Sequence, residues 1–262
     1  MITLYDYLTE LPDKSFSPYA AKVRIVLNYK NLPHRTVFFH PLEIETQIRA
    51  LNLPPNDLDL KPDGSPRYTI PVLHDEATGE AISDSARIID YLDRAYPDTP
   101  QVTSPSTRVT SFAFESTIQG LLLPHLYLVV GPKAVKLQPG DVRKAYFRSV
   151  VEGALGAPIE EWLANPENPQ KVWKDVQGAF DVIDGYYRKA EVIAGLGREE
   201  EKRVFIGGKG MVYADVALAS ILVWVWKVLG EESEEWKRLV TWNGGRWGRL
   251  HEAIKGYTVV HE

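Results

Sequence analysis

Residues 68–75 of the chain, Tyr68-Thr69-Ile70-Pro71-Val72-Leu73-His74-Asp75, decide the fold. A proline stands directly before a short apolar run, which predicts a strand at 72–75. The Thr-Gly pair at 78–79 predicts a turn, and residues 80–82 predict a return strand. Apolar residues at helical spacing over 86–95 then predict a helix.

The residues before this stretch alternate between strand and helix patterns. Residues 2–7 are rich in β-branched and aromatic side chains and predict a first strand. Ser15-Phe16-Ser17-Pro18 predicts a helix start, because serine suits the N-cap and proline the first helical position. Residues 35–39 predict a second strand, and residues 41–68 a short helix and a long loop. The predicted order is β-α-β, a crossover, then β-β-α.

The residues after 97 predict a different architecture. Residues 97–105 hold three prolines and are the best linker candidate. Helical runs follow at about 106–130, 141–164, 170–194, 212–229 and 246–256, and Pro124 predicts a kink or break in the first of them. We therefore expect an α/β domain over 1–97 and an all-α domain over 105–262, a helical bundle.

Composition excludes several classes of function. The chain has 262 residues, a net charge of -5 and no cysteine, so disulfides, zinc–cysteine sites and a cysteine nucleophile are excluded. An acidic chain offers no footprint for nucleic acid. The longest nearly apolar run, 216–226, is too short for a bilayer span of about 20 residues. The N-terminus does not have the pattern of a secretory signal. We expect a cytoplasmic protein with no membrane partner.

Two other motifs do not predict a site. Gly207-Gly208-Lys209-Gly210 lacks the phosphate-binding pattern GxxxxGK[ST] and is interpreted as a loop. The six histidines show no metal-ligand spacing, so no metal site is expected.

The strand and helix order, with a proline before the third strand, resembles the thioredoxin-like fold. More specifically, residues 2–97 resemble glutathione transferases, with the fungal, etherase-related class A group as the nearest match. Four segments carry the resemblance: 16–24, Asp63-Gly64-Ser65-Pro66, 68–75 and Ser83-Asp84-Ser85 with its helix. The helical remainder matches mainly in architecture. Val212 stands where many family members have a serine or threonine cap, so only Asp215 could operate there.

The resemblance implies roles for these segments. Ser17, with Ser15 as runner-up, would hydrogen-bond the thiolate of bound glutathione at a helix N-terminus. A cis Ile70-Pro71 bond would present the Ile70 backbone to the cysteinyl part, and Asp84 with Ser85 would bind the γ-glutamyl end. Taken alone, these are a helix cap, a loop proline and a capping pair.

The resemblance also implies a function and partners. The chain would be a homodimeric transferase that conjugates glutathione, its co-substrate, to aromatic electrophiles, as in detoxification of plant or wood polyphenols. Phe16, Tyr19 and Tyr127 are acceptor-site candidates, although such aromatics can equally fill the seam between domains. The alternatives are a ligandin-type protein that binds hydroxylated aromatics, or glutathione-dependent aryl-ether cleavage. A module in a protein assembly is less favoured, because the chain has no extra segment.

Overall fold

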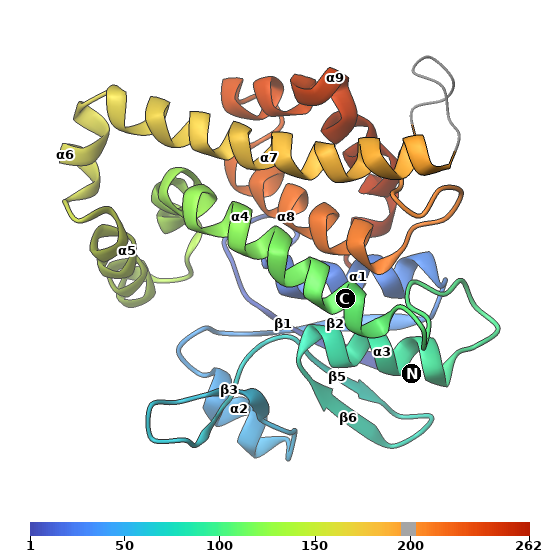
Figure 1. The fold of residues 1–262 in the computed structure, drawn as a ribbon. Helices are drawn as coiled ribbons and strands as arrows, with labels where there is room; N and C mark the ends of the chain where they lie inside the picture. Colours follow the sequence, from blue (N-terminus) through green and yellow to red (C-terminus); the bar gives the residue numbers. More distant parts are fainter. Residues whose placement is uncertain (195–202) are drawn as a thin grey trace. The chain divides into compact units, whose positions relative to one another are not determined.

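The computed structural model describes residues 1–194 and 203–262. These form two compact units, residues 1–104 together with 254–262, and residues 105–253 (Figure 1). The sequence-based boundaries, 1–97 and 105–262, differ from these units at the C-terminal end of the chain. The last residues belong with the first unit because they pack on its first helix.

The first unit is built on a mixed four-stranded sheet in the order β2-β1-β5-β6. Its strands are β1 (Ile2–Tyr7), β2 (His34–Phe39), β5 (Val72–Asp75) and β6 (Glu80–Ser83). β1 is parallel to β2 and antiparallel to β5, and β5 is antiparallel to β6. Together with its helices this is the thioredoxin-like arrangement that the sequence predicts.

Helices α1 (Pro18–Tyr29) and α3 (Ser85–Ala95) pack on each other and on the sheet. The residues that α1 buries include Val23, Val26 and Leu27, and α3 buries Ile88 and Ile89. A second cluster unites the sheet with helix α2 (Ile44–Ala50); its buried members are Tyr5, Phe39, Ile48, Leu53 and Val72. Apolar burial of this kind is the main favourable term in folding.

The segment 41–68 holds more structure than predicted. In addition to α2 it contains two short strands, β3 (Asn56–Leu60) and β4 (Pro66–Arg67), which pair in a separate antiparallel sheet. Residues of β3 after Asn56 are exposed, so no apolar alternation marks this strand. The expected long loop is therefore corrected to a small hairpin.

Three hydrogen bonds attach the C-terminal residues of the chain to the core of the first unit. Asn28 of α1 donates hydrogen bonds to the carbonyls of Tyr257 and Val259, at 2.8 and 3.0 Å. The backbone N–H of Thr36 in β2 donates to the carbonyl of His261. The C-terminal segment thus lies beside β2, the outermost strand on that side of the sheet.

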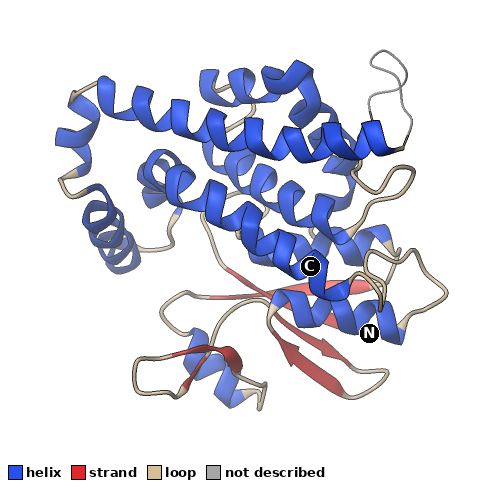
Figure 2. Cartoon of the chain, viewed as in Figure 1, coloured by secondary structure: helices blue, strands red, loops and turns tan. Residues whose placement is uncertain are grey.

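The second unit is helical in all its regular elements among the described residues (Figure 2). Its helices are α4 (Arg108–Ala134), η1 (Val135–Leu137), α5 (Asp141–Leu155), α6 (Ile159–Ala164), α7 (Glu167–Ile193), α8 (Tyr213–Leu229) and α9 (Glu234–Lys255), the last of which runs on into the first unit. Helix α4 packs against α5, α7 and α8. Nearly every residue of α8 is buried, so α8 is the core helix of this unit. The fold class, α/β followed by all-α, is as predicted.

Three helix predictions need correction. α4 runs without a break through Pro124. The run predicted at 141–164 is two helices, because Gly156 adopts a left-handed conformation at the end of α5 and Pro158 follows. α9 consists of two helical segments separated by the non-helical residues Trp242 to Gly245; the second begins at Arg246 as predicted, whereas the first, from Glu234, was not predicted.

One helical stretch among the described residues, Arg108–Leu137, is long and apolar enough to cross a membrane by those criteria alone. Of its most apolar window 39% is buried in the structure, and the helix packs against α5, α7 and α8. The stretch at 216–226, the longest apolar run, lies in the buried α8.

Candidate active site

The register of three neighbouring strands brings the predicted binding segments to one end of the sheet. β1 leads into the loop that carries Ser17, β5 begins directly after Pro71, and β6 ends directly before Asp84. β5 is antiparallel to both neighbours, and its first residue, Val72, lies opposite Tyr5 of β1 and the last residue of β6. The loops that continue from these strand ends therefore meet at the same end of the strands, which we call the site edge of the sheet.

Ser17 caps helix α1 at this edge. Its hydroxyl oxygen accepts a hydrogen bond from the backbone N–H of Ala20 at 3.4 Å, and Pro18 takes the first helical position. A hydroxyl that accepts in this way can still donate its own proton to a further group. The partly exposed helix N-terminus also carries a partial positive charge, which favours an anion such as a thiolate.

Ser15 lies in a different environment. It is 1% exposed, and its hydroxyl donates to Asp6 Oδ2 at 2.6 Å while accepting from Arg24 Nη1 at 3.0 Å. Its side chain is thus part of a buried polar cluster in the first unit. Contact with a ligand would require the loop to move, so the geometry favours Ser17 over Ser15 as the thiol's partner.

The peptide bond between Ile70 and Pro71 is cis, as the resemblance implies. Within the described part of the chain, neither the N–H nor the C=O of Ile70 has a hydrogen-bond partner. Pro71 is buried and Ile70 is half-buried at the start of β5. An edge residue with both backbone groups unused can pair with the extended backbone of a peptide ligand.

Asp84 adopts a positive φ of 80° and caps helix α3. Its Oδ1 accepts from the backbone N–H groups of Ala86 and Arg87, at 2.9 and 3.1 Å. Such a backbone conformation is uncommon for a residue other than glycine, and it is a frequent mark of binding sites. Oδ2 has no partner among the described residues, so it is available to an ammonium group. Ser85, the first residue of α3, is 4% exposed.

The three acceptor-site candidates lie in different surroundings. Phe16 is 7% exposed, and its ring packs on Tyr7 with centroids 5.6 Å apart. Tyr19 is 40% exposed, with the Lys22 ammonium 5.1 Å from its ring centroid. Tyr127 belongs to α4 of the second unit, where its ring meets Phe147. Tyr19 offers the most accessible aromatic face of the three.

Residues 1–194 and 203–262 contain no group of three or more histidine or acidic side chains placed to hold a metal ion.

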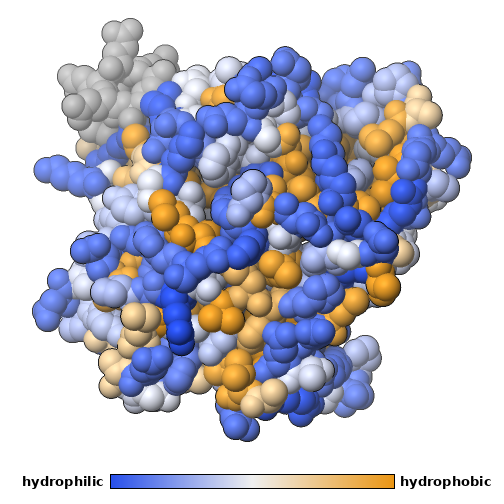
Figure 3. Space-filling view, turned by 180° about the vertical axis from the view of Figure 1, so that it is seen from behind, coloured by the Kyte–Doolittle hydropathy of each residue, from blue (hydrophilic) through white to orange (hydrophobic). Residues whose placement is uncertain are grey.

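On the face seen in Figure 3, hydrophobic residues lie in separate groups among hydrophilic ones. The predicted loop at 207–210 is irregular, apart from a single β-bridge between Phe205 and Gly208.

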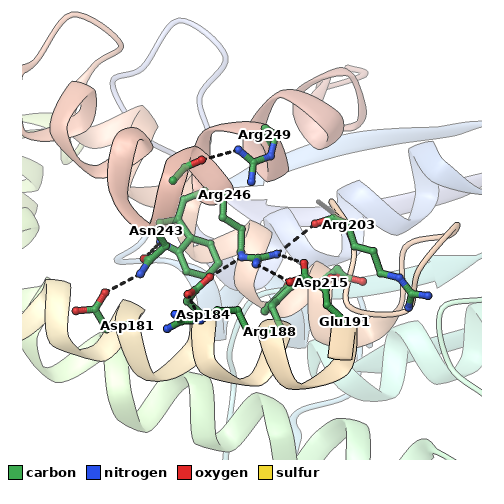
Figure 4. Close-up of polar contacts among 12 residues, drawn as sticks. Asp181, Asp184, Arg188, Glu191, Arg203, Asp215, Asn243, Arg246 and Arg249 are labelled. Carbon is green, nitrogen blue, oxygen red and sulfur yellow. Dashed lines mark hydrogen bonds and ion pairs between the residues drawn. The ribbon is translucent and has the colours of Figure 1, made fainter. Parts of the chain in front are cut away.

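A second polar cluster lies inside the helical unit, around Arg246 (Figure 4). The Arg246 guanidinium pairs with Asp184 of α7 at 2.6 Å and with Glu191 at 2.8 Å. It also donates to the backbone carbonyl of Arg203 at 3.3 Å and lies over the Tyr187 ring at 5.2 Å. These contacts join α7, α9 and the irregular segment before α8. We interpret the cluster as structural, because every charge in it faces another part of the same unit.

Asp215 provides the half of a capping box that the sequence predicts. Its Oδ2 accepts from the backbone N–H of Val212 at 3.0 Å, while Oδ1 accepts from Ile206 at 2.8 Å and from the Tyr187 hydroxyl at 2.9 Å. Val212 has no side-chain oxygen with which to complete the box. Burial raises the pKa of Asp215 to about 6, against the lowering effect of these hydrogen bonds. Burial beside this carboxyl raises the pKa of Tyr187 as well.

The sequence did not lead us to predict that Asp6 and Arg24 hydrogen-bond Ser15, next to the candidate site. The signal was present, because Arg24 stands on the same helix as Val23, Val26 and Leu27, within its apolar run. A charged residue on a buried helix face requires a partner. That partner, Asp6 on β1, could not be identified without the fold.

Family profiles match both parts of the chain. The "Glutathione S-transferase, N-terminal domain" profile matches residues 16–95, and the "Glutathione S-transferase, C-terminal domain" profile matches residues 110–257. The second match alone covers more than half of the chain.

Individual relatives agree with the profiles. The chain is 28% identical to the glutathione S-transferase-like protein ustS of Aspergillus flavus, over 95% of this chain and 88% of that protein. It resembles the structure of the glutathione S-transferase CsGST63524 of Ceriporiopsis subvermispora in complex with glutathione. That likeness has a TM-score of 0.86 and 30% identity, covering 100% of this chain and 99% of the other. Glutathione transferase GSTFuA3 of Phanerochaete chrysosporium gives 0.85 and 29%, covering 100% and 98%.

Proposed function

The chain belongs to the glutathione S-transferase family, and on this premise we propose that it activates the glutathione thiol at Ser17 and conjugates it to aromatic electrophiles. Glutathione is the co-substrate. The observation that carries the proposal is the site edge of the sheet, where the strand register brings together Ser17, the cis Ile70-Pro71 bond and Asp84.

The groups at this edge match the chemistry of glutathione from end to end. Asp84 Oδ2 would accept from the γ-glutamyl ammonium, and the start of α3 at Ser85 would receive the γ-glutamyl carboxylate. The unused N–H and C=O of Ile70 would pair with the cysteinyl backbone. This pose directs the thiol to the N-terminus of α1, next to the Ser17 hydroxyl.

The reaction then needs a thiolate. The thiol gives its proton to solvent, and the Ser17 O–H together with the helix N-terminus stabilises the negative sulfur. The sulfur attacks an electrophilic carbon, a C–S bond forms, and the leaving group departs with its bonding electrons. Because the chain has no cysteine, the only thiol in this chemistry is that of glutathione. A mixed disulfide with the protein is impossible, and we expect very low cysteine-type reductase activity.

We further propose that the acceptors are flat aromatic molecules, including hydroxylated ones of plant or wood origin. The exposed ring of Tyr19, two residues from Ser17, supports this class of acceptor. Phe16 and Tyr127 remain candidates for contact with the acceptor. Glutathione-dependent cleavage of aryl ethers is a related possibility, because an aryl-ether oxygen can serve as the leaving group. The cellular role proposed is detoxification in the cytoplasm, by a homodimer.

A conjugation assay with an activated aryl halide tests the transferase function. Product formation that needs glutathione is expected, and glutathione should also raise the Tm, since a ligand of the native state stabilises it. An unchanged melting curve at millimolar glutathione would contradict the assignment. A solution mass near the 29.6 kDa of one chain would contradict the dimer.

A panel of polyphenols, titrated against the conjugation rate, tests the aromatic acceptor site. Competitive inhibition at micromolar concentration is expected. If aliphatic electrophiles and phenolics behave alike, the aromatic preference is wrong while the glutathione chemistry stands. Tight binding of phenolics without turnover of any electrophile would favour the ligandin alternative.

A further inference from the structure

A closed triangle of buried polar contacts lies beneath the loop that leads to Ser17. Asp6 Oδ2 accepts from the Ser15 hydroxyl at 2.6 Å and from Arg24 Nη2 at 2.6 Å, and Ser15 Oγ accepts from Arg24 Nη1 at 3.0 Å. Asp6, Ser15 and Arg24 are 0%, 1% and 1% exposed. We call these three residues the loop clamp.

The loop clamp joins three pieces of the first unit. Asp6 lies on β1, Ser15 lies in the loop that follows β1, and Arg24 lies in the second turn of α1. The other oxygen of Asp6 accepts from the backbone N–H of Tyr7 at 2.6 Å, which fixes the carboxylate itself. Ser15 is thus held from both ends of the loop, and only Phe16 separates it from Ser17.

Stability alone is a weak explanation for this arrangement. Burying an ion pair has a large desolvation cost, and apolar residues of similar size often stabilise a fold equally well. A buried network in which a carboxylate, a hydroxyl and both terminal guanidinium nitrogens are bonded to one another does, however, allow few alternative geometries, although Arg24 Nε has no hydrogen-bond partner among the described residues. The feature that this network fixes is the path of the chain into the N-terminus of α1.

We propose that Asp6, Arg24 and Ser15 are positioning residues for Ser17, which they hold so that its hydroxyl faces the thiol of bound glutathione. The proposal rests on the function proposed above. Ser15 does not touch the thiol in this scheme; it acts through Ser17. An effect of Ser15 on catalysis therefore has to disappear when the Ser17 hydroxyl is absent.

The neighbouring loop contacts agree with this role. The backbone N–H of Thr9 donates to the carbonyl of Lys14 at 3.0 Å, which closes the loop just before Ser15. The ring of Phe16 packs on Tyr7 directly after Ser15. The three residues before Ser17, namely Lys14, Ser15 and Phe16, are therefore each held by a contact within the first unit.

A double-mutant cycle tests the proposal on the full-length protein. Wild type, Ser15→Ala, Ser17→Ala and the double variant are compared by the pKa of the bound glutathione thiol, from thiolate absorbance against pH. Glutathione affinity is measured at a pH below that pKa. Ser15→Ala should raise the thiol pKa by about one unit, a tenfold loss of thiolate at neutral pH, with affinity changed less than about twofold. In the Ser17→Ala background, Ser15→Ala should shift the pKa no further.

A matched control separates positioning from a general loss of packing. Thr103 also has a buried hydroxyl in the first unit, which donates to Asp93 Oδ2 at 2.6 Å, so Thr103→Val removes a buried hydroxyl–carboxylate hydrogen bond outside the loop clamp. This variant should leave the thiol pKa unchanged even if it alters Tm. Shifts from Ser15→Ala and Ser17→Ala that add in the double variant would overturn the proposal, and so would a silent Ser15→Ala. If wild type binds no glutathione, the proposed function itself fails. This result differs from additive pKa shifts and from a silent Ser15→Ala, which overturn only the positioning role.

Discussion

The hydroxyl of Tyr187 donates a hydrogen bond to the Asp215 carboxylate at 2.9 Å, and this contact joins α7 to the start of the core helix α8. Both side chains are buried, Tyr187 being 1% and Asp215 0% exposed. A carboxyl group in this position senses pH although it lies far from the surface.

The stability of the protein should depend on pH through Asp215. Its folded-state pKa of about 6 lies above the ordinary value of 3.8, so the folded protein binds this proton more tightly than the unfolded chain. The contribution is greatest below about pH 4 and is lost as pH rises through about 6. We expect the free energy of unfolding of wild type, relative to Asp215→Asn, to grow as pH falls, by about 1 kcal/mol per unit between pH 6 and 4. Denaturant titrations of both proteins measure it; a flat difference would mean that the carboxylate stays ionised.

Ser17→Ala should slow conjugation without abolishing glutathione binding. A hydrogen bond to a charged group contributes about 1.5–3 kcal/mol, which corresponds to roughly 10- to 100-fold in rate. The measurement is kcat/KM at neutral pH together with glutathione affinity by calorimetry. If neither Ser17→Ala nor Ser15→Ala changes the rate, the helix N-terminus and backbone stabilise the thiolate alone.

Asp84→Asn should weaken glutathione binding while leaving the cap of α3 in place. Asparagine keeps an oxygen for the N–H groups of Ala86 and Arg87 and tolerates a positive φ. It removes only the charge that would face the ammonium, so we expect roughly a tenfold loss of affinity. A glutathione analogue that lacks the amino group is the control, and it should bind both proteins equally. An equal loss for this analogue would show that the substitution disturbs the site in another way.

Asp93→Ala should destabilise the first unit strongly. Asp93 pairs with Lys30 at 2.6 Å, both side chains are almost wholly buried, and the carboxylate also accepts from Thr103. Its removal leaves a buried ammonium without its counter-ion, and such losses typically cost about 3–5 kcal/mol. Urea unfolding measures the effect. Glu45→Ala, which removes an exposed pair with Arg49, is the control and should leave the midpoint nearly unchanged.

The elements predicted correctly are those whose signals are local. The strand at 72–75 and the start of α1 are read from a proline and from the residues beside it, and both lie where predicted.

The elements that sequence reasoning missed depend on contacts between distant residues. Strand β3 is exposed and is held partly by the pair of Asp59 with Arg67, so no hydrophobic alternation marks it. The non-helical break in α9 includes Asn243, whose side chain bridges Asp181 and Trp247. Neither contact follows from spacing along the chain.

The choice between Ser15 and Ser17 also lay beyond the sequence. Both serines precede the same proline-started helix, and both are common capping residues. Only the buried partners Asp6 and Arg24, distant along the chain, distinguish the two environments.

The hydrogen bond from Thr36 to His261 bears on how the protein behaves at high concentration. β2 is the outermost strand on its side of the sheet, and the C-terminal segment occupies part of its open edge. Unpaired strand edges are templates for association between molecules. Because the C-terminal segment covers part of this edge, we expect variants shortened before residue 261 to lose solubility before they lose their fold.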